Sequence, residues 1–318
     1  MRLLVILSLI AAALASACSQ GDAPAAAPQA TATPALTPLV IAVQPTNTPE
    51  QLSADAKELQ AFLSQQLGRP VEIVFPTTYA GVIEALRFGH AHAALMSAWP
   101  LSLAQKRANA DVVLAEVREV VIGQEKKEAP GYYSYWVVRP DSPYQSLADL
   151  KGKRAALPSA LSTSGYVAPL ARMVELGLVK QEGTREADPR TFFGDVSFAG
   201  GYAQSWEALK AGRADVAVIA GDVSESLYRE VLANTRVVEQ QGPVPSHGLA
   251  VARSLDAPTR DRLIAALLEL NAPERRPLMR KFVSGIFMRF ERTTGDAHLA
   301  SLNGYLKATQ LEFVERLR

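Results

Sequence analysis

At residues 157–166 the chain reads Leu157-Pro158-Ser159-Ala160-Leu161-Ser162-Thr163-Ser164-Gly165-Tyr166. A strand pattern, Arg154 to Leu157, leads into this stretch, and an apolar helical pattern that stops at Gly177 follows it. We expect the helix to start at about Ser164 or Gly165, because Pro169 then lies in the first turn, whose N–H groups have no intrahelical acceptor. Hydroxyl groups beside such free N–H groups and the helix dipole favour an oxyanion pocket. The alternative is a serine-rich N-cap that binds only water.

Strand and helix patterns alternate on both sides of this stretch. The expected strands are 39–43, 71–75, 91–96, 112–121, 132–138, 154–157, 214–220 and 248–252. The expected helices are 52–67, 80–88 and 204–211, and the tail 258–318 is expected to be helical with breaks at Pro273, Pro277 and Gly285. The charged segment 124–129 is expected to be a loop. This alternation predicts an α/β fold with mostly parallel sheets and ligands at the carboxyl ends of the strands.

The length of the chain suggests two lobes. The two βα series would be joined by two hinge crossings, near Tyr135 to Arg139 and near Gln240 to Ser246.

The N-terminus has the pattern of a secretory signal. Arg2 precedes an apolar run from Leu3 to Leu14, and small residues follow up to Ala17, so residues 1–17 are expected to be a signal peptide. Residues 19–38 are rich in Ala, Pro and Thr, which predicts a flexible tether. The lone Cys18 excludes an intrachain disulfide.

The residues before Cys18 resemble the lipobox of bacterial lipoproteins. This resemblance implies a diacylated Cys18 that anchors the chain in a membrane, in the periplasm or another extracytoplasmic space. Ala15 stands where leucine is more usual, and an ordinary signal peptidase site is the alternative.

The charge of the mature chain is balanced. The full chain has 33 basic and 32 acidic residues, and residues 1–17 contain one basic and no acidic residue, so 32 of each remain. A neutral chain offers no electrostatic argument for nucleic acid or for an anionic membrane surface as a partner.

Several motifs occur in a fixed order along the chain. They are Thr78 to Gly89, Gly131 to Ser134, Asp149 to Lys153, Ser162 to Tyr166, Gly200-Gly201 and Ala208 to Asp215. This order resembles the phosphonate, phosphite and phosphate binding proteins of ABC importers, from about Leu39 to about Ala252. The Ser-Thr-Ser-Gly segment is the most specific part of the resemblance.

The resemblance implies a type II periplasmic-binding fold, with an anionic ligand held between two lobes and passed to a membrane permease. It implies that both ends of the mature chain, residues 39–137 and 243–318, form lobe 1 and that the middle, residues 138–242, forms lobe 2. It implies that Tyr79 meets the ligand and that Ser162, Thr163, Ser164 and Gly165 form the oxyanion cradle. Asp222 matches an acidic residue that accepts a proton from the ligand or pairs its amino group. No cofactor, metal or enzymatic activity is implied, and a monomer is expected.

Two positions depart from the pattern of the family. Leu103 stands where a ligand-contacting tyrosine is usual, and Tyr202 stands where a histidine is usual. We count Tyr202 among the ligand-binding candidates, together with Trp99 as an apolar wall of the cleft. These two departures change which polar side chains can contact the ligand. The identity of the chemical group that the ligand carries on its oxyanion therefore stays open.

The remaining candidates are weaker. His90 and His92 lack a third metal ligand in the sequence, and a surface position is the alternative. His247 is a candidate for the hinge, Trp206 for the cleft or the core, and one of the tyrosines 132, 133 and 135 for the ligand.

Two functions remain compatible with the same fold. The first is capture of a phosphorus oxyanion for import, and the second is a ligand-sensing subunit coupled to a membrane histidine kinase. An enzyme is disfavoured, because no residue is placed by the sequence to activate Ser162 or Ser164 as a nucleophile.

Overall fold

The computed structural model describes residues 37–44, 49–122, 125–281 and 285–312. The expected signal peptide 1–17, Cys18 and the tether up to residue 36 lie outside these residues. Leu36–Arg318 form one compact unit, and all that follows concerns that unit. Among the described residues, no helix is both long enough and apolar enough to cross a membrane.

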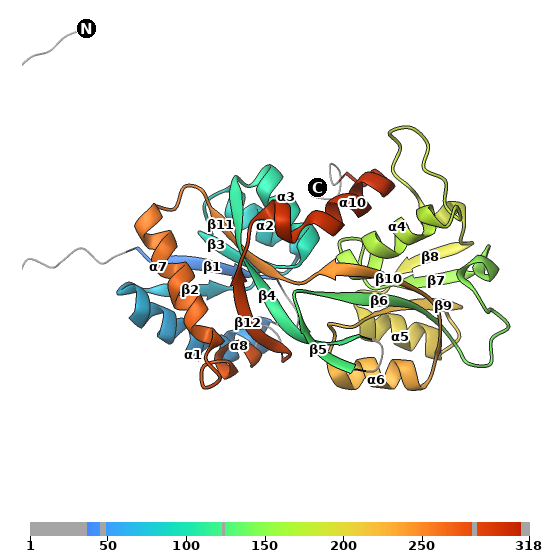
Figure 1. The fold of residues 1–318 in the computed structure, drawn as a ribbon, viewed down its shortest axis with the longest axis horizontal. Helices are drawn as coiled ribbons and strands as arrows, with labels where there is room; N and C mark the ends of the chain where they lie inside the picture. The colour runs from blue at the N-terminus through green and yellow to red at the C-terminus, as the bar shows by residue number, and fades with distance from the viewer. Residues whose placement is uncertain (1–36, 45–48, 123–124, 282–284, 313–318) are drawn as a thin grey trace, which may run out of the picture. The chain divides into compact units, whose positions relative to one another are not determined.

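The first of two sheets has seven strands (Figure 1). They are β1 (Leu39–Val43), β2 (Val71–Val74), β3 (Ala93–Met96), β4 (Ala110–Ile122), β5 (Glu125–Ala129), β11 (Gly248–Ala252) and β12 (Phe287–Arg292). Their order is β12-β4-β11-β3-β1-β2, with β5 paired to β4. Strand β1 is parallel to β2 and β3, whereas β11, β12 and β5 pair antiparallel with their neighbours.

The second sheet has five strands. They are β6 (Gly131–Val138), β7 (Arg154–Leu157), β8 (Asp195–Phe198), β9 (Val216–Ala220) and β10 (Arg236–Pro245). Their order is β10-β6-β9-β7-β8, with β7 parallel to β8 and β9, and β6 antiparallel to β9 and β10. The expectation of mostly parallel sheets is therefore wrong. The antiparallel pairs involve the strands on either side of the two crossings between the lobes, which are β4, β6, β10 and β11. The chain leaves and re-enters each sheet through these strands, so they run in opposite directions.

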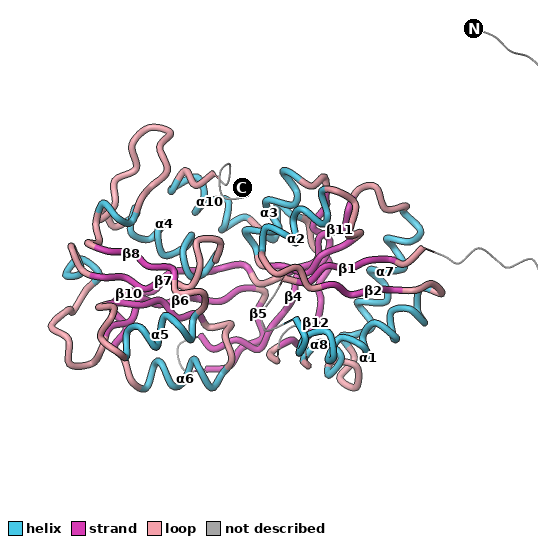
Figure 2. Tube along the Cα trace, turned by 180° about the vertical axis from the view of Figure 1, so that it is seen from behind, coloured by secondary structure: helices cyan, strands magenta, loops and turns pink. Residues whose placement is uncertain are grey.

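Helices cover both faces of both sheets (Figure 2). They are α1 (Pro49–Leu67), α2 (Tyr79–Arg87), α3 (Ala98–Arg107), α4 (Ala168–Glu175), α5 (Tyr202–Lys210), α6 (Glu225–Ala233), α7 (Ala257–Leu268), α8 (Pro277–Arg280), α9 (Gly295–His298) and α10 (Ala300–Thr309). Short helical turns are η1 (Leu147–Leu150), η2 (Thr163–Val167), η3 (Pro189–Thr191) and η4 (Glu269–Asn271). Helix α3 and helix α6 were not expected from the sequence.

The hydrophobic core is divided by the alternation of side chains along the strands. In β6, Trp136 and Val138 belong to a cluster that also contains residues of α2, α3 and α4, while Tyr135 and Val137 pack with α5 and α6. Successive strand side chains point to opposite faces, which explains this division. The first cluster is continuous from one sheet to the other, so apolar packing joins the two lobes beside the candidate site.

The sheet membership locates the crossings between the proposed lobes. All of β6 belongs to the second sheet, so the first crossing lies at Pro130 rather than near Tyr135 to Arg139. The return lies at Ser246-His247, where Glu116 N–H donates to the His247 carbonyl at 2.8 Å. Helix α10 then packs against α4 and η2, so the C-terminal part of the proposed lobe 1 contacts lobe 2.

Two segments expected to be loop or helix are strands. The segment Glu125–Ala129 is charged and exposed, yet it pairs with β4 along its whole length, as a polar edge strand does. The tail contains β12, in which Phe287 and Phe290 are both buried. Their spacing of three indicates a helix, but a bulge between Phe287 and Arg289 places both rings on the core side.

Candidate functional site

The segment between β7 and α4 forms the predicted cradle. Ser162 caps the helix with its side chain, because its Oγ accepts a hydrogen bond from Gly165 N–H at 2.9 Å. The first turn, η2, is a π-turn, and the α-helical register begins only at Ala168. Pro169 therefore stands at the second position of α4, directly after the π-turn. The predicted start at Ser164 or Gly165 is thus one or two residues late, and the type of the turn was not predicted.

Gly165 gives the cradle its close packing. A Cβ at this position would overlap the Pro158 ring and approach Ser162 Oγ to 2.8 Å. Only glycine lets the backbone of η2 lie against the end of β7, which brings the N–H of residue 165 to the capping oxygen.

Two tyrosines from the second sheet and its helices reach the cradle hydroxyls. The Tyr202 hydroxyl at the start of α5 lies 2.6 Å from Ser164 Oγ and 3.3 Å from Ser162 Oγ. The Tyr132 hydroxyl on β6 donates to Ser164 Oγ at 3.1 Å. Burial and the negative charge of Asp222 raise the pKa of both phenols, so both stay neutral and able to donate.

The first lobe contacts the cradle through α3. The backbone N–H of Trp99 donates to Thr163 Oγ1 at 3.0 Å, across a sequence separation of 64 residues. The Trp99 and Leu103 side chains are both buried in the core cluster that joins the two sheets. The departure at Leu103 is thus an apolar core residue.

Tyr79 lies at the first position of α2, which follows the carboxyl end of β2. Burial raises the pKa of its phenol, and the negative charge of Asp222 from the other lobe adds to the rise. Gln44, at the carboxyl end of β1, is 4% exposed, and its Oε1 accepts hydrogen bonds from Ser97 N–H and Oγ, both at 3.0 Å. Tyr79 is also hydrogen-bonded to Gln44. Polar side chains that follow β1 and β2 therefore lie close to Asp222.

Asp222 follows β9 and is held by a buried cation. Arg118 Nη1 donates to Asp222 Oδ2 at 3.1 Å, and Arg118 Nε donates to Glu116 Oε2 at 2.8 Å. The side chains of Arg118, Glu116 and Asp222 are 3%, 0% and 9% exposed. Burial raises the pKa of Asp222, and the charge of Arg118 opposes that rise.

The structure thus brings Tyr79, Thr163, Ser164, Tyr202 and Asp222 into one interlobe region, with Ser162 and Gly165 in the cradle itself. Sequence reasoning missed Gln44, Glu116 and Arg118. The signals were present: Gln44 is the polar residue directly after a buried strand, and Glu116 and Arg118 are charges two apart in an apolar strand, so they share a face.

Other candidates lie elsewhere. Trp206 packs on the α5–α6 face of the second sheet and donates to Glu230 Oε1 at 2.8 Å. His92 Nδ1 accepts a hydrogen bond from Val40 N–H at 3.0 Å, and His90 is exposed. Over the residues that the structure describes, no three His, Cys, Asp or Glu side chains are grouped to hold a metal ion. His247 lies at the return crossing, and burial together with the charges of Arg118 and His298 lowers its pKa well below the usual range.

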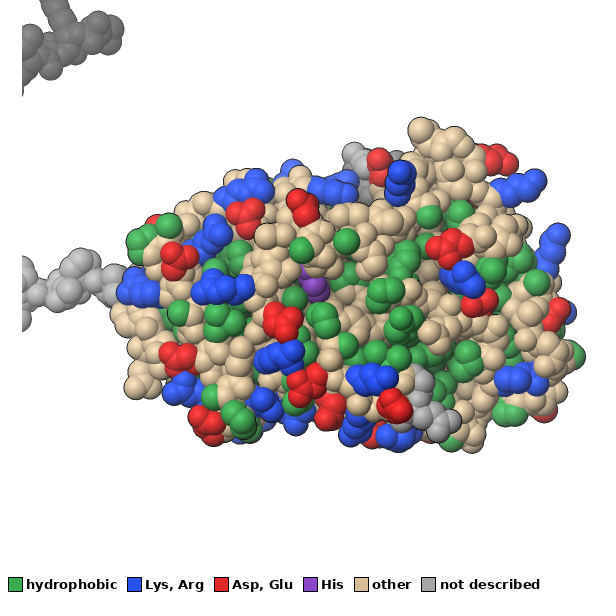
Figure 3. All heavy atoms as spheres, viewed as in Figure 1, with side chains coloured by type: hydrophobic (Ala, Val, Ile, Leu, Met, Phe, Trp, Pro, Cys, Tyr) green, Lys and Arg blue, Asp and Glu red, His purple; other side chains and the backbone are tan. Residues whose placement is uncertain are grey.

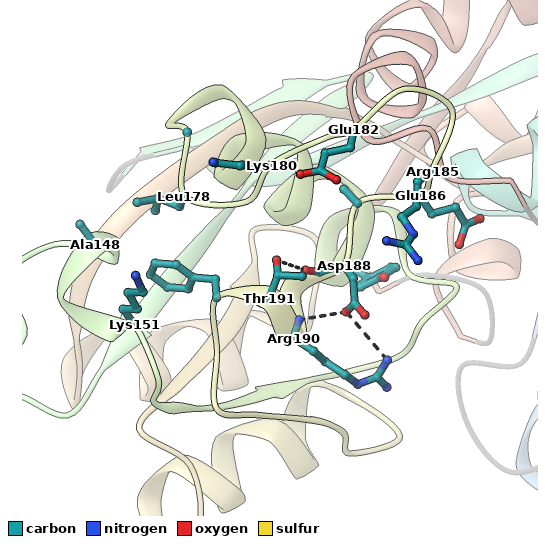
Figure 4. Close-up of a pocket in the computed structure, with 14 residues that line it drawn as sticks. Ala148, Lys151, Leu178, Lys180, Glu182, Arg185, Glu186, Asp188, Arg190 and Thr191 are labelled. Carbon is teal, nitrogen blue, oxygen red and sulfur yellow. Dashed lines mark hydrogen bonds and ion pairs between the residues drawn. The ribbon is translucent and has the colours of Figure 1, made fainter.

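An open cavity of about 860 Å³ lies on lobe 2 (Figure 4). It is bordered by the loop from Gly177 to Phe192 and by Lys151, and none of the predicted site residues lines it. Four basic and three acidic side chains line it, so their charges nearly cancel. Basic and acidic side chains are also interspersed over the face drawn in Figure 3. This face therefore presents no field of one sign that would attract an anion.

Two α/β lobes with a hydroxyl cradle and buried tyrosines between them define a substrate-binding protein of the periplasmic type. The model of the family described as "ABC transporter, phosphonate, periplasmic substrate-binding protein" matches residues 41–299. The chain belongs to this family, as the motif order predicted.

Individual relatives agree with the family. The chain is 32% identical over 205 residues to the phosphate-import protein PhnD of Mycolicibacterium smegmatis, which covers 64% of this chain and 60% of that protein. A binding protein component of an ABC phosphonate transporter from Pseudomonas aeruginosa superposes with a TM-score of 0.68 at 20% identity, over 85% of this chain and 86% of that one. PhnD1 from Prochlorococcus marinus in complex with methylphosphonate gives 0.67 at 14% identity, over 85% and 97%. These structures confirm the predicted fold class.

Proposed function

We propose that the protein captures a phosphorus oxyanion, namely a phosphonate, phosphite or phosphate, between its two lobes and delivers it to the membrane permease of an ABC importer. The single observation that carries the proposal is the cradle: the Ser162, Thr163 and Ser164 hydroxyls converge with the Tyr202 and Tyr132 hydroxyls at an interface between the lobes.

The chemistry of the cradle supports an oxyanion as the ligand. Serine, threonine and tyrosine hydroxyls donate hydrogen bonds to oxyanions. The N–H groups of Gly165, Tyr166 and Val167 are already bonded to Ser162, so the hydroxyls are the donors on which the proposal rests. Inside the site these hydroxyls bond to one another, and a tetrahedral anion offers each of them an acceptor. The names of the M. smegmatis and P. marinus relatives, which import phosphate and bind methylphosphonate, support the same ligand class.

A thermal-shift screen tests this proposal directly. Phosphate, phosphite, hypophosphite and methylphosphonate are added to the purified protein, with sulfate as a tetrahedral control. At a concentration of about one hundred times Kd, a ligand that binds only the folded state stabilises it by about 2.7 kcal/mol, so at least one phosphorus compound is expected to raise Tm. If none of the four changes Tm, the protein does not bind this class of anion.

We also propose that Cys18 is lipidated and tethers the binding unit to the outside of a membrane. The residues before Cys18 support this, as does the segment between Cys18 and β1, which is rich in Ala, Pro and Thr and has almost no large apolar side chains. Replacement Cys18→Ser is expected to move the protein from the membrane fraction to the soluble extract. An unchanged membrane fraction would contradict the lipid anchor.

A further inference from the structure

Glu116 and Arg118 are two buried charges on one face of β4. Arg118 is bonded to Glu116 on one side and, across the lobes, to Asp222 on the other. Arg118 Nη2 is buried without a hydrogen-bond partner among the described residues, so the guanidinium is held through Nε and Nη1. This arrangement holds the carboxyl group of Asp222 beside a buried cation.

Asp222 lies next to the groups that contact the cradle. Its charge acts on the phenols of Tyr79, Tyr132 and Tyr202, and the last two are bonded to Ser164. An oxyanion on the cradle therefore lies close to the Asp222 carboxylate. Two negative oxygen groups at close range in a buried site repel each other strongly, unless they share a proton.

The charges around Asp222 leave no surplus cation for the ligand. Glu116 and Asp222 are two carboxyl groups bonded to one guanidinium, that of Arg118, which is always protonated. The other titratable groups that face Asp222 are the neutral phenols of α2, β6 and α5. His247 faces Arg118 from the return crossing, and its lowered pKa keeps it neutral.

We propose that Arg118, held in place by Glu116, is a positioning residue that keeps Asp222 ionised in the ligand-free site, so that the ligand brings the proton that the two acidic groups share. This inference rests on the proposed function. The proton lies between the Asp222 carboxylate and one phosphorus-bound oxygen in the complex. Asp222 is then an acceptor in the empty site, and the site selects oxyanions that carry or can take up one proton.

The proposal sets the number of protons that accompany binding. With Arg118 present, Asp222 is ionised, and a fully deprotonated ligand takes up one proton as it binds. In Arg118→Met, Asp222 loses its cation and takes up the proton before the ligand arrives. At a pH between the Asp222 titration in the wild type and its raised titration in the variant, binding to the variant is therefore accompanied by about one proton fewer than binding to the wild type.

The experiment measures this proton count with methylphosphonate as the probe. Calorimetric titrations at one pH, in buffers of different ionisation enthalpy, give the protons exchanged per bound ligand. Arg118→Met is expected to differ from wild type by about one proton, and Arg118→Lys, which keeps a cation, is expected to retain the wild-type count. Asp222→Asn is the reference that shows how much of the count belongs to this carboxylate.

A second measurement needs no ligand. The carboxyl ¹³C signal of Asp222, assigned by its absence in Asp222→Asn, is titrated in the wild type and in Arg118→Met. Removal of the adjacent cation is expected to move its titration upward by about 1–3 pH units. If Arg118→Met does not fold, the double variant Glu116→Gln/Arg118→Met removes both partners, so that no unpaired Glu116 is left buried. An upward shift is still expected, but a smaller one, because the charge of Glu116, which raises the pKa of Asp222, is removed as well.

The outcomes separate the alternatives. An unchanged Asp222 titration, or the same proton count in Arg118→Met as in wild type, means that Arg118 has only a structural role, and either result overturns the proposal. Equal counts for wild type and Asp222→Asn place Asp222 away from the ligand and also overturn it. If wild type binds no methylphosphonate or other phosphorus oxyanion, the proposed function fails instead, and the titration of the empty protein still tests Arg118.

Discussion

Replacement of Ser162 and Ser164 together by alanine is expected to weaken binding of the phosphorus oxyanion at least about tenfold, or about 1.4 kcal/mol. Two hydroxyl donors are lost from the cradle, and the Tyr202 and Tyr132 hydroxyls lose the serine oxygen atoms that position them. Ser162 Oγ also caps Gly165 N–H, so its loss frees the backbone of η2. Isothermal calorimetry with the best ligand from the thermal-shift screen measures the change.

The control for this variant is Ser226→Ala. Ser226 is an exposed serine on α6, far in the sequence from the cradle, and its replacement removes the same hydroxyl group. Its affinity is expected to equal that of the wild type. If the double cradle variant also binds with wild-type affinity, the hydroxyls at residues 162–164 do not hold the ligand.

Replacement Gly165→Ala is expected to have the other large effect, on both stability and binding. The added methyl group meets the Pro158 ring and Ser162 Oγ, so either the end of β7 or the first turn of η2 must move. Overpacking of this kind costs about 1–3 kcal/mol of folding free energy. Because the displaced atoms form the cradle, ligand affinity is expected to fall more than tenfold as well, or by more than about 1.4 kcal/mol.

Gly304→Ala is the matched control for this glycine. Gly304 is exposed in the interior of α10, and a Cβ there meets nothing within 4 Å. Alanine is favoured over glycine in a helix interior by about 0.5–1 kcal/mol, so this variant is expected to raise Tm slightly and leave affinity unchanged. A Gly165→Ala protein with wild-type Tm and affinity would show that the cradle is not tightly packed.

The cradle could be predicted from the sequence because its geometry is local. A strand that ends at Leu157, a capping serine at residue 162 and a helix that stops at Gly177 lie within about twenty residues, and helix capping acts over a single turn. Gly177 adopts the positive φ of 69° that a helix stop requires. The boundaries of β1, β7 and β11 follow for the same reason, since each is a short apolar run between turn residues.

The charged part of the site could not be predicted in this way. Arg118 and Asp222 are 104 positions apart and meet only because β4 and the end of β9 face each other across the lobes. The order of strands in each sheet is also a matter of tertiary pairing, which is why the antiparallel pairs around β4 and β6 were missed. A bulge, such as the one in β12, can place residues three apart on the same face of a strand. The spacing of the buried residues then resembles that of a helix.

A crystal structure of the protein with methylphosphonate is the most direct test of the central claim, that the hydroxyl cradle between the lobes holds the ligand. The account predicts phosphonate oxygen atoms within hydrogen-bond distance, about 2.5–3.0 Å, of the Ser162, Thr163 and Ser164 hydroxyls, with one oxygen facing Asp222. A phosphonate bound instead in the open cavity beside Lys151 and Arg185, with the cradle hydroxyls still bonded to one another, would contradict it.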